Sequence, residues 1–324
     1  METQMNKKRN FVTGNRKVAI IGAGYVGSTI AYALALRDIA REIALIDINE
    51  EKTLGEVKDI RHGIPILGTT DVYVGDYSDC ENCDLIIIAA GRNRRNNESR
   101  LDLTNDNIKI IRSVVDSIKK YYTRGVIVIV SNPVDILTYK VSKWMDLPDG
   151  MVFGTGCILD TSRFVRSISD YVGVSTGVIS AYVIGEHGDG QVPIWSHVTI
   201  SGIGIEEYCE SVGLQWNEQI KKDIAEKTKN MGASIIAAKG RTHYGIATCV
   251  CVLADAIINQ RPTIVPVSSV LKGENGVNDV ALSVPSVIGP GGVQLRIKER
   301  WSQEEYQKFL DSAQKISNKL KEFA

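Results

Sequence analysis

The stretch KVAIIGAGYVGSTIAYALAL, residues 17–36, decides the fold of this chain. It opens with KVAII, an apolar run of the kind found in strands that are buried on both faces. Three glycines follow with the spacing G-x-G-x-x-G, and the apolar residues after them recur with helical periodicity. A strand, a glycine-rich turn and a helix in this order predict the start of a βαβ unit.

The pattern continues outward through the first half of the chain. Short apolar runs alternate there with helical patterns: EIALID (42–47), a helical stretch at 50–62, DVYVGD (71–76), DLIIIAA (84–90) and GVIVIV (125–130). Runs that are apolar on both faces and separated by helices indicate a parallel sheet covered on both sides.

The second half of the chain has a different character. It carries longer helical patterns at 206–239 and 243–260, a strand-like run at 265–273, a predicted hairpin at 283–297 and an amphipathic helix from about 302. We therefore expect an α/β fold, with a Rossmann-type doubly wound parallel sheet followed by an α+β substrate domain.

Composition excludes several classes of function. Lys+Arg and Asp+Glu both total 38 in 324 residues, so no overall basic field favours nucleic acid or a membrane surface. The polar start METQMNKKRNFVTGNRK lacks an apolar signal core, which favours a cytoplasmic protein. Six scattered cysteines then indicate reduced thiols, and the four histidines form no HExxH motif, so we expect no metal.

The glycine motif predicts a dinucleotide site. Gly22 permits the tight turn, Gly24 lets the backbone approach a pyrophosphate, and Gly27 lets the helix pack close to the strand. The phosphates would meet the free N–H groups and partial positive charge of the helix N-terminus. Asp47 ends the next strand, where it can accept hydrogen bonds from ribose hydroxyls and would repel a 2′-phosphate, which favours NAD over NADP.

These observations divide the chain into three parts. Residues 1–16 form an expected flexible N-terminal lead-in, residues 17–155 an NAD-binding Rossmann domain, and residues 156–324 a catalytic or substrate domain.

The second half supplies candidate catalytic residues. His187 lies between glycines in YVIGEHGDGQVPIWSH, after a strand-like run. Oxidation of an alcohol needs a base of near-neutral pKa to accept the hydroxyl proton, and histidine suits that role. In ILDTSRF, Asp160 and Arg163 are three residues apart and share one side of a helix. Arg163 is suited to a bidentate grip on a substrate carboxylate.

From about residue 17 to the C-terminal helix, the chain resembles the L-lactate/L-malate dehydrogenase family. The motifs that carry the resemblance occur in the family's order: GAGYVG, LIDIN, ESRLDL, SNPVDILT, LDTSRF, IGEHGDGQVPIWSH and KGRTHYGIA. The resemblance implies that His187 is the acid/base, Asp160 its partner, Arg163 the carboxylate clamp and Arg100 the arginine that polarises the reacting carbonyl.

The resemblance also implies further contacts and an assembly. Asn132 matches a residue that contacts both substrate and nicotinamide, and further cofactor contacts fall on Val26, Lys52, Tyr77, Gly91 and Ser131. The implied protein is a cytoplasmic enzyme of glycolysis and fermentation that acts on a small 2-oxo or 2-hydroxy acid. The family forms dimers and tetramers, and a homotetramer is expected.

The arginine-rich stretch GRNRRNNESR, residues 91–100, bears on the substrate. Arg94 falls where malate enzymes of the family carry arginine and lactate enzymes glutamine; a second substrate carboxylate would need such a cation. Thr242 and Glu98 instead follow the lactate pattern, and Asn96-Asn97 replaces the usual Pro-Gly. Arg92 or Arg95 could meet the pyrophosphate or solvent.

We therefore expect an L-lactate dehydrogenase that interconverts pyruvate and L-lactate. The alternatives are an L-malate dehydrogenase, an enzyme for another 2-hydroxy acid, and a dinucleotide-binding protein without catalysis. Many bacterial lactate enzymes are activated by fructose 1,6-bisphosphate through an arginine and a histidine, whose positions correspond here to Val165 and Ser180. Neither side chain carries charge, so we expect no strong activation by that ligand.

Overall fold

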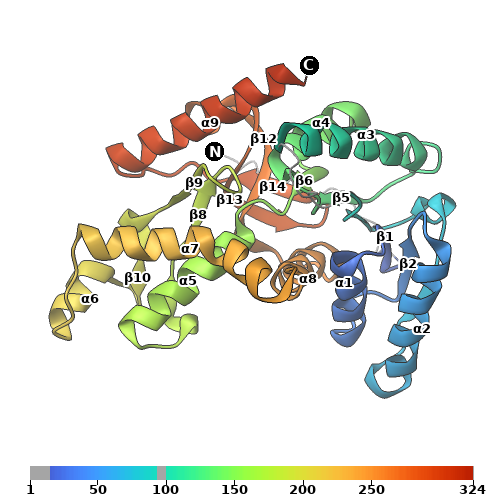
Figure 1. The fold of residues 1–324 in the computed structure, drawn as a ribbon, viewed down its shortest axis with the longest axis horizontal. Helices are drawn as coiled ribbons and strands as arrows, with labels where there is room; N and C mark the ends of the chain where they lie inside the picture. Colours follow the sequence, from blue (N-terminus) through green and yellow to red (C-terminus); the bar gives the residue numbers. More distant parts are fainter. Residues whose placement is uncertain (1–14, 93–99, 324) are drawn as a thin grey trace, which may run out of the picture.

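The computed structural model describes residues 15–92 and 100–323. Most of the predicted lead-in, residues 1–14, lies outside the described residues. Within the described part of the chain, eleven strands form one sheet, in the order β3-β2-β1-β4-β5-β6-β12-β13-β8-β9 with β14 paired to β13 (Figure 1).

The first half of the chain builds the parallel part of this sheet. The order β3-β2-β1-β4-β5-β6 is that of a doubly wound dinucleotide-binding fold, and it reverses direction between β1 and β4. The elements are β1 (Lys17–Ile21), α1 (Tyr25–Leu36), β2 (Glu42–Ile46), α2 (Glu50–Leu67), β3 (Asp71–Val74), η2 (Tyr77–Cys80), β4 (Leu85–Ile88), α3 (Arg100–Ile118), β5 (Val126–Ile129), α4 (Val134–Met145) and β6 (Val152–Gly154).

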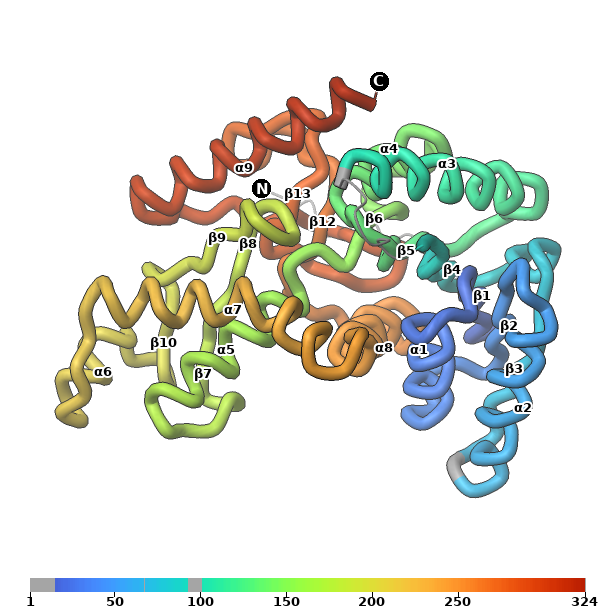
Figure 2. Tube along the Cα trace, in the orientation of Figure 1, coloured from blue at the N-terminus to red at the C-terminus, as the bar shows by residue number. Residues whose placement is uncertain are grey.

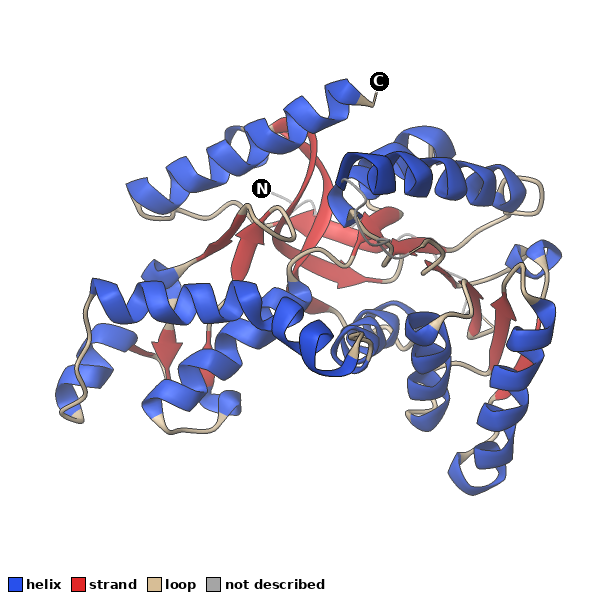
Figure 3. Ribbon diagram, in the orientation of Figure 1, coloured by secondary structure: helices blue, strands red, loops and turns tan. Residues whose placement is uncertain are grey.

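Helices cover both faces of the parallel strands. In Figure 3, α3 and α4 lie on one side of the sheet and α1 and α2 on the other. Because successive residues of a strand point to opposite faces, β1 contributes to two cores. Val18 and Ile20 pack with α1 and α2, whereas Ala19 and Ile21 pack with α3 and α4.

The second half extends the same sheet with antiparallel strands. β6 pairs with β5 in parallel and with β12 in antiparallel orientation, so the sheet continues across the two halves. The elements are α5 (Ile158–Val172), η3 (Thr176–Val178), β7 (Ile179–Ser180), β8 (Val183–Gly185), β9 (Gln191–Pro193), η4 (Trp195–His197), β10 (Thr199–Ile200), β11 (Ile203–Gly204), α6 (Ile205–Ser211), α7 (Glu218–Lys239), α8 (Tyr244–Ile258), β12 (Thr263–Lys272), η5 (Glu274–Gly276), β13 (Asn278–Gly289), β14 (Gly292–Arg296) and α9 (Gln303–Glu322).

The fold class predicted from the sequence is confirmed, with one local correction. The predicted hairpin is the antiparallel pair β13 and β14. The helical pattern at 206–239 is not one helix, because the chain turns between α6 and α7 at Gly213, whose φ is +71°. Asn217 then caps α7 by accepting a hydrogen bond from the Ile220 N–H at 3.0 Å.

The two halves meet along the central strands. The tube in Figure 2 shows α9, from the end of the chain, on the same side of the sheet as α3 and α4. Lys140 of α4 reaches the last turn of α9 and donates to the carbonyl of Phe323 at 2.6 Å. Among the helices described, none combines the length and the apolar character needed to cross a membrane.

Candidate active site

A cavity of about 950 Å³ opens at the carboxyl ends of β4 and β5, beside the first turn of α1. In open α/β sheets, ligands bind in this crevice, where the strand order reverses. The C-terminal part of α9 lines one side through Lys315 and Lys319, together with Phe323 at its C-cap. Six of the residues singled out in the sequence line the cavity: Val26, Gly91, Arg92, Ser131, Asn132 and His187.

The glycine loop has the geometry that a bound pyrophosphate needs. Gly22 has φ +106°, and a Cβ there would lie 2.7 Å from the backbone nitrogen of Ala90. A Cβ on Gly27 would lie 1.8 Å from the carbonyl oxygen of Gly22. Gly24, at the N-cap of α1, has no side-chain cap, and its missing Cβ would meet nothing within 4 Å. The first turn of α1 therefore leaves open space beside backbone N–H groups, as a phosphate site requires.

Asp47 lies beside this loop. Its Oδ2 accepts a hydrogen bond from the Ala23 N–H at 2.7 Å, and its Oδ1 accepts one from the Asn49 N–H at 3.0 Å. A carboxylate oxygen has further acceptor capacity, so Asp47 can still receive ribose hydroxyls. Of the other predicted contacts, Lys52 lies over the Tyr25 ring at 5.5 Å, and Tyr77 is half-buried near Asp47.

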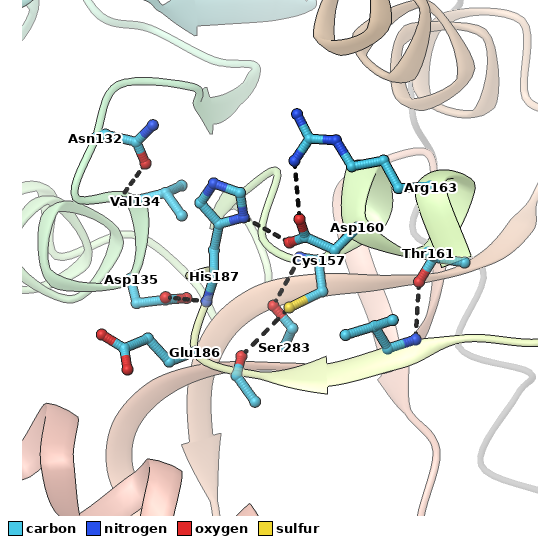
Figure 4. Close-up of polar contacts among 12 residues, drawn as sticks. Asn132, Val134, Asp135, Cys157, Asp160, Thr161, Arg163, Glu186, His187 and Ser283 are labelled. Atoms are coloured by element: carbon cyan, nitrogen blue, oxygen red, sulfur yellow. Dashed lines mark hydrogen bonds and ion pairs between the residues drawn. The ribbon is translucent and has the colours of Figure 1, made fainter. Parts of the chain in front are cut away.

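His187 and Asp160 form a hydrogen-bonded pair in the second half of the site. His187 follows β8, Asp160 lies in the first turn of α5, and His187 Nδ1 is 2.6 Å from Asp160 Oδ2. The imidazole faces the cavity while the aspartate is buried. Figure 4 shows the ring pointing toward Asp160, with Nε2 on its opposite side. This arrangement fixes the tautomer and leaves Nε2 for a substrate.

The pair is electrostatically coupled. Burial favours the neutral imidazole, but the Asp160 carboxylate outweighs this effect and raises the pKa of His187 above its ordinary value. Burial likewise favours a protonated Asp160, but the charges and hydrogen bonds of His187 and Arg163 hold its pKa below the ordinary value. Asp160 therefore stays ionised and stabilises the imidazolium.

Arg163 lies one helical turn beyond Asp160. Its Nη1 donates to Asp160 Oδ1 at 3.2 Å, and its side chain is only 12% exposed. The guanidinium lies against α7 at Gly232, where a Cβ would come within 3.3 Å of Nη2. Contacts on both sides hold the arginine beside the histidine, where its remaining N–H groups can bind a carboxylate.

Ser131 and Asn132 lie in the turn between β5 and α4. The Ser131 hydroxyl donates to the carbonyl of Ala90 at 2.5 Å, which joins this turn to the end of β4. The carbonyl of Asn132 accepts a hydrogen bond from the Asn107 side chain at 2.8 Å, and Asn107 Oδ1 accepts the Arg92 N–H at 3.0 Å. Asn107, which is buried in α3, thus fixes both turns that border the cavity.

Other predicted residues are placed differently or are not placed. Thr242 is half-buried between α7 and α8 and is absent from the lining of the cavity. Arg92 does line the cavity, but its guanidinium forms an ion pair with Asp106, Nη2 to Oδ2, at 2.6 Å. Arg94 and Glu98 lie outside the described residues, as do Arg95 and Asn96-Asn97. Arg100 begins α3, and its side chain also lies outside the described part of the structure.

Sequence reasoning did not single out Asn107 or Asp135. Asn107 has no local signal, since a single amide in an amphipathic helix is ordinarily a surface residue. Asp135 had a usable signal, because it stands in PVDIL, an apolar context directly after a buried strand. The structure buries it and directs its Oδ2 to the backbone N–H of His187 at 2.8 Å (Figure 4).

One of the cysteines, Cys157, lies beside Asp160 in the site (Figure 4). All six are buried and free, and burial raises the pKa of the Cys80 and Cys83 thiols to about 12. Within the described residues, no group of three or more His, Cys, Asp or Glu side chains is arranged to hold a metal ion.

A dinucleotide crevice that leads to a histidine–aspartate pair and a partly buried arginine defines a nicotinamide-dependent dehydrogenase. The comparisons with known proteins agree. Residues 16–154 match the family model described as lactate/malate dehydrogenase, NAD binding domain, and residues 157–324 match the model of its alpha/beta C-terminal domain. The chain belongs to the lactate/malate dehydrogenase family.

Similar proteins cover nearly the whole chain. The L-lactate dehydrogenase of Acetivibrio thermocellus is 41% identical over 308 residues, which is 95% of this chain and 96% of that protein. The L-lactate dehydrogenase of Priestia megaterium is 40% identical over 306 residues, or 94% of this chain and 96% of that protein. The crystal structure of the minor L-lactate dehydrogenase from Enterococcus mundtii superposes with a TM-score of 0.92 at 37% identity, covering 97% of this chain and 99% of that one.

Proposed function

We propose that this chain is an NAD-dependent L-lactate dehydrogenase, which reduces pyruvate to L-lactate and catalyses the reverse reaction. The observation that carries the proposal is the His187–Asp160 pair, whose imidazole faces the cavity at the mouth of the dinucleotide crevice. The relatives named L-lactate dehydrogenase, about 40% identical over most of the chain, support pyruvate as the substrate. In this proposal residues 17–155 bind the cofactor and residues 156–324 complete the substrate site.

The cofactor residues fit NAD. The open space at Gly24 would receive the pyrophosphate, and Asp47 would bind the adenine ribose and disfavour a 2′-phosphate. Val26, Lys52, Tyr77, Gly91, Ser131 and Asn132 would supply further contacts. The bound nicotinamide would supply or accept the hydride, and the protein's side chains would bind the substrate and transfer the proton.

Each catalytic side chain has one proposed role in pyruvate reduction. Arg163 binds the pyruvate carboxylate, Arg100 polarises the keto oxygen, and His187 donates a proton from Nε2 to that oxygen. Asp160 holds the imidazole in the right tautomer and stabilises its charge, and Asn132 helps to place the substrate. We further propose that the protein is cytoplasmic and a homotetramer, with a dimer as the alternative, and that it serves glycolysis and fermentation.

The decisive experiment measures NADH oxidation with pyruvate, oxaloacetate and longer 2-oxo acids side by side. Pyruvate should give the highest kcat/KM. A higher kcat/KM with another acid would reassign the substrate, and no turnover with any of them would support the alternative of a dinucleotide-binding protein without catalysis. Oxidation of NADPH at a comparable kcat/KM would contradict the proposed role of Asp47.

Arg94 supports one second candidate, an L-malate dehydrogenase, because an arginine in this stretch can pair with a second substrate carboxylate. The variant Arg94→Gln tests this idea. If Arg94 binds that carboxylate, the ratio of kcat/KM for pyruvate over oxaloacetate should rise at least about tenfold, or 1.4 kcal/mol. An unchanged ratio would mean that Arg94 does not reach the substrate.

A further inference from the structure

Asp135 is a buried carboxylate for which the proposed reaction gives no role. It lies in the first turn of α4, is 2% exposed, and its Oδ2 accepts the backbone N–H of His187 at 2.8 Å. A buried carboxylate is costly unless charge or hydrogen bonds compensate for its lost hydration. The position of the charge, beside the histidine, therefore calls for a functional explanation.

Two aspartates hold His187 at two different points (Figure 4). Asp160, from α5, accepts the ring Nδ1–H at 2.6 Å, and Asp135, from α4, accepts the backbone N–H. Asn132 lies in the turn that borders the cofactor crevice, and Asp135 follows it by three residues. Asp135 thus joins the cofactor half of the chain directly to the main chain of the histidine.

The charged and polar groups around the Asp135–His187 contact come from α5, β12, α9 and the loop after β8. Asp160 and Arg163 lie on α5, with the Cys157 thiol at its N-cap; Glu186 precedes His187 and is paired with Lys319 of α9 at 2.6 Å. The buried Ser268 hydroxyl of β12 also faces Asp135. In the described part of the chain, Asp135 forms no ion pair with a lysine or arginine, so its charge acts on His187 without a competing cation in contact.

We propose that Asp135 is a positioning residue of the dehydrogenase, which fixes the His187 main chain beside the cofactor crevice and stabilises the imidazolium with its charge. This inference rests on the proposed function and adds a second carboxylate to the His187–Asp160 pair. The electrostatics agree with it. Burial raises the pKa of Asp135 to about 6, although the Ser268 hydroxyl and His187 favour the ionised form, so the group is charged at neutral pH. The same charge contributes to the raised pKa of His187.

The test uses Asp135→Asn, which retains an acceptor for the His187 N–H and removes the charge. Pyruvate reduction requires protonated His187, so kcat/KM should fall as pH rises through the pKa of that group. In the variant this fall should occur about half a pH unit or more lower, while the Tm at pH 7.5 stays equal or rises because a buried charge has gone. The control is Thr138→Val, an isosteric change at a fully buried position one turn along α4, which should leave the pH midpoint unchanged.

An unchanged midpoint in Asp135→Asn would overturn the proposal, as would an equal shift in Thr138→Val. A second measurement needs neither turnover nor a variant: NMR titration of the parent protein, following the Asp135 carboxyl carbon and the His187 ring. The two groups should titrate with mutual inflections, and independent curves would overturn the proposal. Lack of pyruvate turnover by the parent would instead contradict the proposed function, and the NMR result would still decide the coupling.

Discussion

The His187 imidazole owes its chemistry to what its Nδ1 contacts. Asp160 accepts that nitrogen at 2.6 Å and is itself held by Arg163 at 3.2 Å, so both carboxylate oxygens are occupied. A buried, hydrogen-bonded carboxylate cannot turn away from the ring, and this fixes the proton-donating nitrogen toward the cavity.

The variant Asp160→Asn should distinguish a catalytic effect of Asp160 on His187 from a purely structural role. We expect kcat for pyruvate reduction to fall about 10²- to 10⁴-fold, because the amide neither fixes the tautomer nor stabilises the imidazolium. The raised pKa of His187 should drop, so the loss of activity with rising pH should begin at a lower pH. Steady-state kinetics from pH 5 to 9 measure both effects. Asp170→Asn, an exposed change on the same helix, should alter neither; equal kinetics for both variants would contradict the assignment.

Two glycines of the crevice, Gly24 and Gly27, should respond differently to substitution by alanine. Gly24→Ala places a Cβ in open space at an ordinary φ of −72°, so the fold should be unaffected while NADH binding weakens at least about tenfold. Gly27→Ala places its Cβ 1.8 Å from Gly22 O and should disrupt the loop itself. Gly55→Ala, a helical position with nothing within 4 Å, is the control. Fluorescence titration measures the NADH affinity of each variant, and thermal melts measure its stability. Undiminished NADH affinity in Gly24→Ala would argue against a phosphate beside Gly24.

At the scale of elements, the end of the chain is secured by a capping box. Ser302 Oγ accepts the Glu305 N–H at 3.3 Å, and Glu305 Oε2 accepts the Ser302 N–H at 2.9 Å. Glu305 also accepts the Ser196 N–H at 2.9 Å and the Ser196 hydroxyl at 2.6 Å. One buried carboxylate therefore begins α9 and also ties it to η4, which places the far end of α9 over the cavity.

Glu305→Gln should lower the free energy of unfolding by about 1–3 kcal/mol at pH 7, because several hydrogen bonds to a charged acceptor weaken. Burial raises the pKa of Glu305, but these hydrogen bonds outweigh it and leave the pKa below its ordinary value of 4.5. The ionised Glu305 therefore contributes its full stabilisation above pH 4.5, the ordinary pKa. This stabilisation is lost as the pH falls through the lower pKa that Glu305 has in the folded protein. Urea unfolding should show that the difference in the free energy of unfolding between the parent protein and Glu305→Gln is smaller at pH 4 than at pH 7. The control is Glu304→Gln, a change at the exposed neighbouring residue. A difference in the free energy of unfolding between the parent and Glu305→Gln that grows in acid would refute this role of Glu305.

The sequence predicted elements unequally well. The parallel strands and the helices between them were predicted from periodicity. The strands are buried on both faces and the helices along one stripe, so each gives a local pattern of apolar residues. The break between α6 and α7 was missed, because a single glycine at 213 within helical spacing does not reveal a positive φ.

At the scale of the molecule, the shared sheet brings the cofactor crevice and the substrate residues together. β6 pairs with β5 on one side and β12 on the other, so the two halves share one sheet. Asp149 precedes β6 and binds Arg296 of β14 through both carboxylate oxygens at 2.9 and 3.0 Å, which adds a second link between the halves. These contacts join the two halves and so position His187 relative to the dinucleotide crevice.

Regulation belongs to the same scale. The family resemblance implies that a fructose 1,6-bisphosphate site would involve two positions: Val165, which is apolar and half-buried, and Ser180, which is exposed and uncharged. Adding this ligand should therefore leave the half-saturating pyruvate concentration unchanged within about twofold, because neither side chain can compensate phosphate charge. Initial-rate assays with and without the bisphosphate, with inorganic phosphate as the ionic control, measure this. A severalfold decrease specific to the bisphosphate would show a site elsewhere.

The sequence alone determined the dinucleotide crevice, since strand, glycines, helix and Asp47 lie within about thirty residues and are encoded by local turn chemistry and periodicity. It also supplied the residue types of the catalytic group through their motifs. The family resemblance implied that Asp160 partners His187 across 27 residues, and the tertiary structure brings the two side chains together. Only the tertiary structure decided that Asp135, 52 residues away, accepts the backbone N–H of His187. Such contacts depend on how helices pack on a shared sheet, and no pattern of neighbours along the chain records that packing.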